Sequence, residues 1–114
     1  MSDLINKKCM PCEGGVTPFD ISEIHKYQKK VDGWDIVKSE KHIYFLEKKF
    51  IFQNFLESQN FINEVGKISE QEGHHPDISF GWGYAKINIT THAIEGLSEN
   101  DFILAAKIDK ITNV

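Results

Sequence analysis

Apolar residues recur along this chain with two different periods, and each change of period marks a boundary between predicted elements. A spacing of three or four residues is typical of a helix that is buried on one side. Alternation of apolar and polar residues, or a short apolar run between turn residues, is typical of a strand. The predicted helices cover residues 21–31, 54–71 and 99–112. The predicted strands cover residues 34–40, 42–52, 77–83 and 84–92.

The order of these elements predicts the fold class. The chain runs α-β-β-α-β-β-α, and only a short turn separates the two strands of each pair. Short turns favour antiparallel pairing, because parallel strands need a longer crossover connection. We therefore expect an α+β fold, with a four-stranded antiparallel sheet and the helices packed on one face.

The last predicted helix is apolar on almost every side. Its apolar residues are Phe102, Ile103, Leu104, Ala105, Ala106, Ile108 and Ile111. One sheet covers only one side of a helix, and a large exposed apolar patch favours association. We therefore predict a homodimer or homotetramer, with the last helix or the sheet edge in the contact. Ser98 and Asp101 have the spacing of a capping box, which assigns Asp101 to the start of this helix.

Length and charge argue against several classes of protein. The chain has 114 residues, enough for one domain, which we place at residues 18–114 after a flexible N-terminal segment at residues 1–17. No apolar run approaches the roughly 18 to 20 residues that cross a bilayer. The N-terminus lacks the apolar core of a secretion signal, so we expect a cytoplasmic protein. The net charge is −4 and arginine is absent, which argues against a nucleic-acid partner.

The only two cysteines, Cys9 and Cys12, form a C-x-x-C motif near the N-terminus. A redox motif is expected at the start of a helix after a buried strand, and a structural zinc site needs a second pair of ligands. The sequence provides neither context. We therefore interpret the pair as dispensable, reduced thiols in the flexible segment, with a metal or redox role as the alternative.

Three histidines, His74, His75 and His92, are the candidates for chemistry. His74 and His75 follow the long helix in a loop stiffened by Pro76, and adjacent side chains diverge in an extended backbone. That divergence argues against a metal site, whose ligands must converge. By the alternation of the last strand, His92 projects from its polar face, with a plain surface histidine as the alternative. Imidazole titrates near neutral pH, so general acid–base catalysis is the chemistry favoured.

Two carboxylates, Glu70 and Glu72, stand at the end of the long helix, directly before the histidine pair. Either one could hydrogen-bond to an imidazole and fix its orientation. Glu72 also continues the apolar side of the helix, which is an unusual position for a carboxylate.

The chain resembles the pterin-4a-carbinolamine dehydratases in the ordered set Glu70-x3-His74-His75-Pro76-x5-Trp82-x9-His92-x8-Asp101. The likeness covers about residues 18 to 112, and the ordered spacing is far more specific than any single element. The C-x-x-C motif is similar to that of bacterial members. The chain departs from familiar members at Ile78, where some carry tryptophan, and at Gly83, which replaces a larger polar residue. These departures could reshape the pterin pocket.

The resemblance implies an activity. Members of the family act on the 4a-hydroxytetrahydropterin that aromatic amino-acid hydroxylases produce, and remove water to give quinonoid dihydropterin. By position, His74 and His92 would be the acid–base pair, while His75 would bind and orient the pterin. Glu70 would position a histidine or the substrate. Neither a metal nor another cofactor is required.

Trp82 occupies an aromatic position of the family signature, which makes it a candidate for substrate binding. Its strand parity is that of Ile78 and Phe80, which favours packing in the core instead.

The biological role has alternatives. The resemblance implies tetrahydrobiopterin recycling beside an aromatic amino-acid hydroxylase. Mammalian relatives also act as a dimerisation cofactor for a transcription factor, so a non-catalytic interaction module is one alternative. Other relatives are linked to molybdopterin metabolism, which would change the pterin and not the fold. The presence of all three histidines favours the enzyme.

Overall fold

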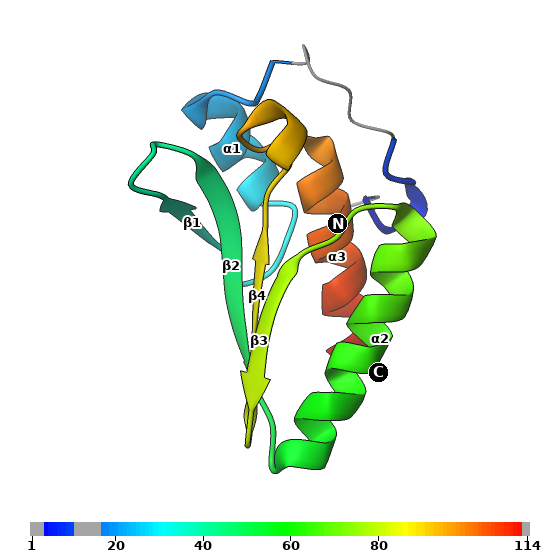
Figure 1. The fold of residues 1–114 in the computed structure, drawn as a ribbon. Coiled ribbons are helices and arrows are strands. Elements are labelled where there is room, and N and C mark those ends of the chain that lie inside the picture. The colour runs from blue at the N-terminus through cyan, green and yellow to red at the C-terminus, as the bar shows by residue number, and fades with distance from the viewer. Residues whose placement is uncertain (1–3, 11–16, 113–114) are drawn as a thin grey trace.

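The computed structural model describes residues 4–10 and 17–112 (Figure 1). The helices are η1 (Leu4–Asn6), α1 (Ile21–Gln28), α2 (Phe55–Glu72), η2 (His92–Ile94) and α3 (Glu99–Thr112). The strands are β1 (Asp35–Lys38), β2 (Tyr44–Ile51), β3 (Asp77–Gly81) and β4 (Tyr84–Ile89). The α-helices and strands follow the predicted order, and the two short 3-10 helices, η1 and η2, are additions to it. Among the described residues, no helix is long and apolar enough to cross a membrane.

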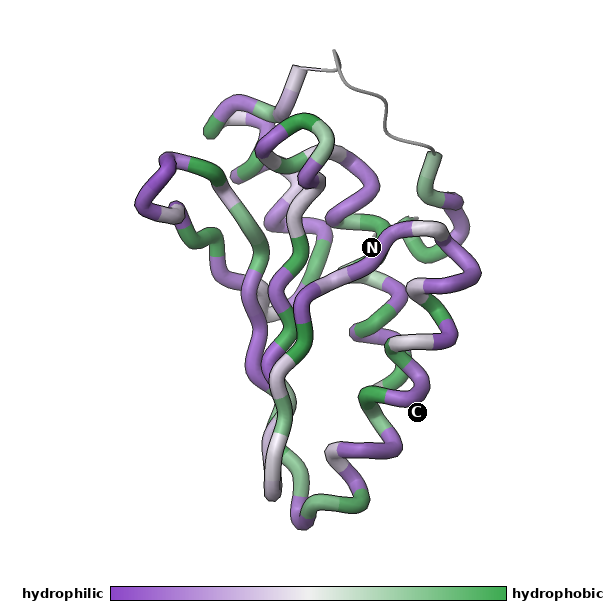
Figure 2. The backbone as a smooth tube through the Cα atoms, viewed as in Figure 1, coloured by the Kyte–Doolittle hydropathy of each residue, from purple (hydrophilic) through white to green (hydrophobic). Residues whose placement is uncertain are grey.

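The four strands form one antiparallel sheet in the order β1-β2-β4-β3. Figure 1 shows α2 and α3 on the same side of this sheet. Along β4, Ala85, Ile87 and Ile89 are fully buried and the residues between them are half-buried, so one face of the strand packs against the helices. Figure 2 shows apolar and polar residues alternating along β4 and apolar residues recurring along α2. The α+β prediction is confirmed.

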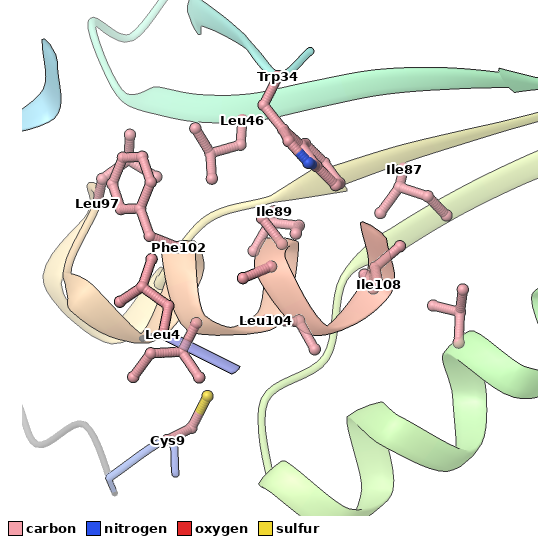
Figure 3. Packing of buried hydrophobic residues seen from close by; sticks show 14 of the residues in the cluster. Leu4, Cys9, Trp34, Leu46, Ile87, Ile89, Leu97, Phe102, Leu104 and Ile108 are labelled. Carbon is pink, nitrogen blue, oxygen red and sulfur yellow. The ribbon is translucent and has the colours of Figure 1, made fainter. Parts of the chain in front are cut away.

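α3 lies in the interior of the protein. Its apolar residues from Phe102 to Ile108 are buried, because the sheet packs on one side while α1, α2 and η1 contact the others (Figure 3). The expectation that a second subunit is needed to cover this helix is therefore wrong. Beyond α1, the exposed large apolar side chains are Ile51, Phe55, Leu56, Ile78, Phe80 and Trp82.

The segment Leu4–Met10 packs against the helices. Leu4 is fully buried in the same cluster as Phe102, and Cys9 is buried beside it (Figure 3). The Cys9 N–H donates to Glu72 Oε1 at 2.9 Å, and the Cys9 thiol donates to the carbonyl of Asn100 at 3.4 Å. For these residues the prediction of a flexible segment is corrected. Cys12, the other half of the C-x-x-C motif, lies outside the described residues.

Candidate active site

The loop that carries His74 and His75 is shaped at both of its ends. α2 ends at Gly73, which adopts a φ of 65°, a left-handed conformation that glycine takes without strain. The N–H groups of Gly73 and His74 both donate to the carbonyl of Ser69, the second at 3.2 Å. Pro76 then favours an extended backbone at His75, directly before β3. The two histidines are therefore held between the end of a helix and the start of a strand.

His74 is bonded to a buried carboxylate of α3. Its Nε2 lies 2.7 Å from Oδ1 of Asp101, which is fully buried, and the His74 side chain is only 12% exposed. The second oxygen of Asp101, Oδ2, accepts hydrogen bonds from the Thr91 hydroxyl and the Ser98 N–H, each at 2.8 Å. A carboxylate only accepts, so Nε2 of His74 carries the hydrogen and Nδ1 is the basic nitrogen of the neutral ring. The network fixes both the tautomer and the orientation of His74.

His75 pairs with a carboxylate in a very different environment. Its Nε2 hydrogen-bonds to Oε2 of Glu70, near the end of α2. Both side chains are more than half exposed, so water screens their interaction. His74 and His75 therefore bind different carboxylates, as expected for adjacent side chains that diverge.

His92 reaches the site from a turn. β4 ends at Ile89, after which Thr91 forms an isolated bridge with Gly96, its N–H donating to the Gly96 carbonyl at 2.9 Å. His92 follows as the first residue of η2, and its side chain is exposed. The expectation that His92 projects from the polar face of a regular strand is therefore wrong, because the strand ends before it.

All three histidines line one hollow, which we name the histidine pocket. It has a volume of about 260 Å³ and is lined by Met10, Gly73, His74, His75, Thr90, Thr91, His92 and Ala93. A second hollow of about 220 Å³ shares Thr90 and His92 with it. A larger hollow, about 450 Å³, is lined mainly by apolar residues from the end of β2, the middle of α2 and the end of α3, and no histidine lines it. The histidine pocket is the candidate active site, because the titratable groups converge there.

The family model described as pterin 4 alpha carbinolamine dehydratase matches residues 17–111 of the chain. This chain belongs to that family. It is similar to a protein of Rubrobacter xylanophilus, provisionally named a pterin-4-alpha-carbinolamine dehydratase, with 46% identity over 97% of this chain and 100% of that protein. A relative from Rickettsia bellii with the same provisional name is 46% identical over 96% of this chain and 95% of its own length.

Two solved structures share the fold. A transcriptional coactivator/pterin dehydratase from Brucella melitensis has a TM-score of 0.75 at 23% identity, over 83% of this chain and 98% of that one. A pterin dehydratase-like protein identified as a RuBisCO assembly factor in the alpha-carboxysome has a TM-score of 0.59 at 25% identity, over 69% of this chain and 88% of that one. Members of this fold are thus described both as dehydratases and as assembly factors.

In this member of the pterin carbinolamine dehydratase family, Asp101 has a structural role that was predicted and a second that was missed. As the capping box predicts, its carboxylate accepts from the Ser98 N–H at the start of α3. It also holds His74, which the sequence did not reveal. One feature of the sequence could have indicated this contact. Asp101 is a carboxylate on a helix with apolar residues on almost every side, and a buried carboxylate needs hydrogen-bond partners.

Trp82 lies outside the histidine pocket of this family member. It occupies the turn between β3 and β4, at the opposite end of β3 from His75, and is 71% exposed. The expectation of core packing is therefore wrong, and the lining of the pocket does not include its side chain. β3 is an edge strand with exposed residues on both faces, so strand parity does not predict burial there.

Glu72 and Cys9 stabilise the fold beside the site. The Glu72 carboxylate accepts hydrogen bonds from Lys107 Nζ at 2.6 Å and from the Cys9 N–H at 2.9 Å. Burial opposes the charge of Glu72, but these hydrogen bonds outweigh it and hold the pKa of Glu72 below its usual value. Burial, reinforced by the charge of Glu72, raises the pKa of the Cys9 thiol to about 12, so Cys9 stays protonated. Across residues 4–10 and 17–112, no three His, Cys, Asp or Glu side chains are placed to hold a metal ion.

Proposed function

We propose that this chain is a 4a-hydroxytetrahydropterin dehydratase, a carbon–oxygen lyase that uses histidine acid–base catalysis without a metal ion. The observation that carries the proposal is the histidine pocket, which three histidines line and in which one of them is bonded to a buried carboxylate. Family membership supports a pterin as the substrate.

The reaction needs two proton transfers and no change of oxidation state. The bond between carbon 4a and its hydroxyl oxygen breaks, and a proton delivered to that oxygen lets it leave as water. A base takes the proton from the neighbouring ring nitrogen, and the electron pair of that N–H bond forms the new C=N double bond. One acid and one base beside the same ring are therefore sufficient.

We assign the base to His74 and the acid to His92. Nε2 of His74 is committed to Asp101, which leaves Nδ1 to accept the proton from the pterin. The buried carboxylate stabilises the imidazolium that forms, as the carboxylate does in a catalytic triad. His92 is exposed, so it can regain a proton from water after each turnover. His75, paired with Glu70, binds and orients the pterin at the open side of the pocket.

The proposal is tested by the rate at which the purified protein dehydrates 4a-hydroxytetrahydropterin, followed by absorbance with the spontaneous rate subtracted. We expect an acceleration that persists after dialysis against a strong chelator. Absence of any acceleration would contradict the enzyme and favour a non-catalytic interaction module. Activity that is lost to the chelator and restored by zinc would contradict the metal-free mechanism.

We further propose that the reaction serves tetrahydrobiopterin recycling for an aromatic amino-acid hydroxylase. The resemblance in the spaced site residues supports this role, because the substrate is the product of such hydroxylases. A hydroxylase gene next to the gene for this chain would support it. Molybdenum-cofactor genes in that position would favour a different pterin.

We also propose that the chain forms a homodimer or homotetramer through the edge of its sheet. β3 is an edge strand, and the exposed side chains of Phe80 and Trp82 lie on it and in the following turn. The Phe80 ring packs against that of Phe55, with centroids 5.5 Å apart, which extends the apolar surface to α2. An exposed strand edge with apolar side chains favours pairing with a second copy. Sedimentation should show an oligomer that Phe80→Lys weakens, and a monomer at micromolar concentration would contradict the proposal.

A further inference from the structure

One wall of the histidine pocket comes from a residue far earlier in the sequence. Met10 lines the pocket together with His74 and His92, and this residue is 69% exposed. The rest of the lining consists of histidines, threonines, a glycine and an alanine, so Met10 is its longest apolar side chain. A side chain this open at the edge of a pocket gains contacts when a ligand fills the pocket.

The backbone of Met10 is fixed by a buried side chain of α3. The Met10 N–H donates to Asn100 Oδ1 at 2.9 Å, and Asn100 Nδ2 donates to the Met10 carbonyl at 2.6 Å. Both polar backbone groups of Met10 therefore bond to one carboxamide. Asn100 directly precedes Asp101, so one turn of α3 both holds Met10 and orients His74.

A second anchor lies one residue before Met10. The Cys9 N–H donates to Glu72, whose carboxylate also accepts from Lys107. At the start of the segment Leu4 is fully buried. These contacts hold the segment in place without using the Met10 side chain, so that side chain can be shortened without releasing the backbone.

We propose that Met10 is a substrate-contacting residue that sets the affinity of the histidine pocket for the ring of the pterin, an inference that rests on the proposed function. The thioether of methionine is polarisable and packs favourably against flat conjugated rings. It neither donates nor accepts a proton near neutral pH, so it strengthens binding without entering the acid–base steps. A contact of this kind is made equally before and during the reaction, and its loss raises KM while kcat is kept.

The experiment compares Met10→Ala, Met10→Leu and Ile5→Ala with the wild-type protein. KM and kcat are measured for dehydration, and Kd is measured for a stable oxidised pterin by quenching of its fluorescence. Met10→Ala should raise both KM and Kd by roughly 2- to 10-fold, the range for one sulfur–ring contact, with kcat nearly unchanged. Met10→Leu keeps an apolar side chain of similar length without the sulfur, so its KM and Kd should lie between those of Met10→Ala and the wild type. Ile5→Ala is the matched control, because Ile5 lies in the same segment but lines a different hollow.

The outcomes separate this inference from the proposed function. Wild-type dehydration with unchanged KM and Kd in Met10→Ala would overturn the inference and leave the enzyme intact. A fall in kcat at constant KM would also overturn it, because the role would not be ground-state contact. A wild-type protein that neither dehydrates nor binds pterins would overturn both. Thermal melting of each variant should match the wild type, since the anchors of the segment are unchanged.

Discussion

His74 and His75 are neighbours in the sequence, and each pairs with a carboxylate, yet the two pairs differ in nearly every physical respect. Asp101 is fully buried and bonds to two further donors besides His74. Glu70 is largely exposed, as is His75, and water weakens their attraction. A carboxylate alone does not fix a histidine. Burial and the additional partners of the carboxylate decide which of the two rings has a single orientation.

The largest effects are expected when each imidazole ring is removed in turn. His74→Ala should lower kcat by roughly 10² to 10⁴, the usual cost of losing a general acid or base. His92→Ala should cost a similar factor, and the double variant should fall well short of the product of the two losses, because they act as a unit. His75→Ala should mainly raise KM. Steady-state kinetics on folded variants gives the result, and normal turnover by His74→Ala or His92→Ala would refute the acid–base pair.

A smaller effect is expected when the carboxylates are changed and the rings are kept. Asp101→Asn should lower kcat by roughly 10- to 100-fold, less than removal of the ring does, because the proposed base itself is kept. The amide can donate a hydrogen bond to Nε2 and so favour the other tautomer of His74. Glu70→Gln, the matched control at the exposed pair, should change kcat by no more than a few-fold.

The two carboxylate variants are compared at equal folded fraction, with circular dichroism as the check on folding. The loss of kcat should be much larger in Asp101→Asn than in Glu70→Gln, because only Asp101 touches the proposed base. Equal losses in both variants would mean that burial does not distinguish the pairs.

The sequence predicts the parts of the fold whose burial depends on residues that are close in the chain. α3 has its predicted bounds, because Ser98 and Asp101 mark its start and apolar residues fill its length. The burial of Ala85, Ile87 and Ile89 follows from alternation, since β4 is a central strand with one face under the helices. These features depend on neighbours within a few residues, which periodicity records.

The errors arise where burial is decided by distant segments. Leu4 and Cys9 fill space beside α3, and no periodic pattern in the first ten residues indicates this. Trp82 has the same strand parity as Ile78 and Phe80, but its strand is at the edge of the sheet, so alternation does not decide which residues are buried there. The spacing of the site residues predicts the three histidines as candidates, and they line one pocket. The partnership of Asp101 with His74 depends instead on how α3 packs against the loop after α2.

The smallest effect concerns Cys9, a third titratable group that lies beside a carboxylate. Burial, with the charge of Glu72 added, raises the pKa of Cys9 from 9.0 to about 12. Between these two values the unfolded thiol loses its proton while the folded one keeps it, so the unfolded state binds fewer protons. The free energy of unfolding therefore falls as pH rises from about 9 towards 12, and this contribution is fully present below pH 9.

Melting curves from pH 8 to 11 should show a steeper loss of Tm in the wild type than in Cys9→Ala. Cys12→Ser keeps the Cys9 thiol and should follow the wild type. The pKa of Tyr27 is also raised, by burial and by its hydrogen bond to Glu99, but Tyr27 is present in all three proteins and so does not affect the comparison. Parallel curves for wild type and Cys9→Ala would show that the thiol ionises alike in both states, and that burial has not shielded it.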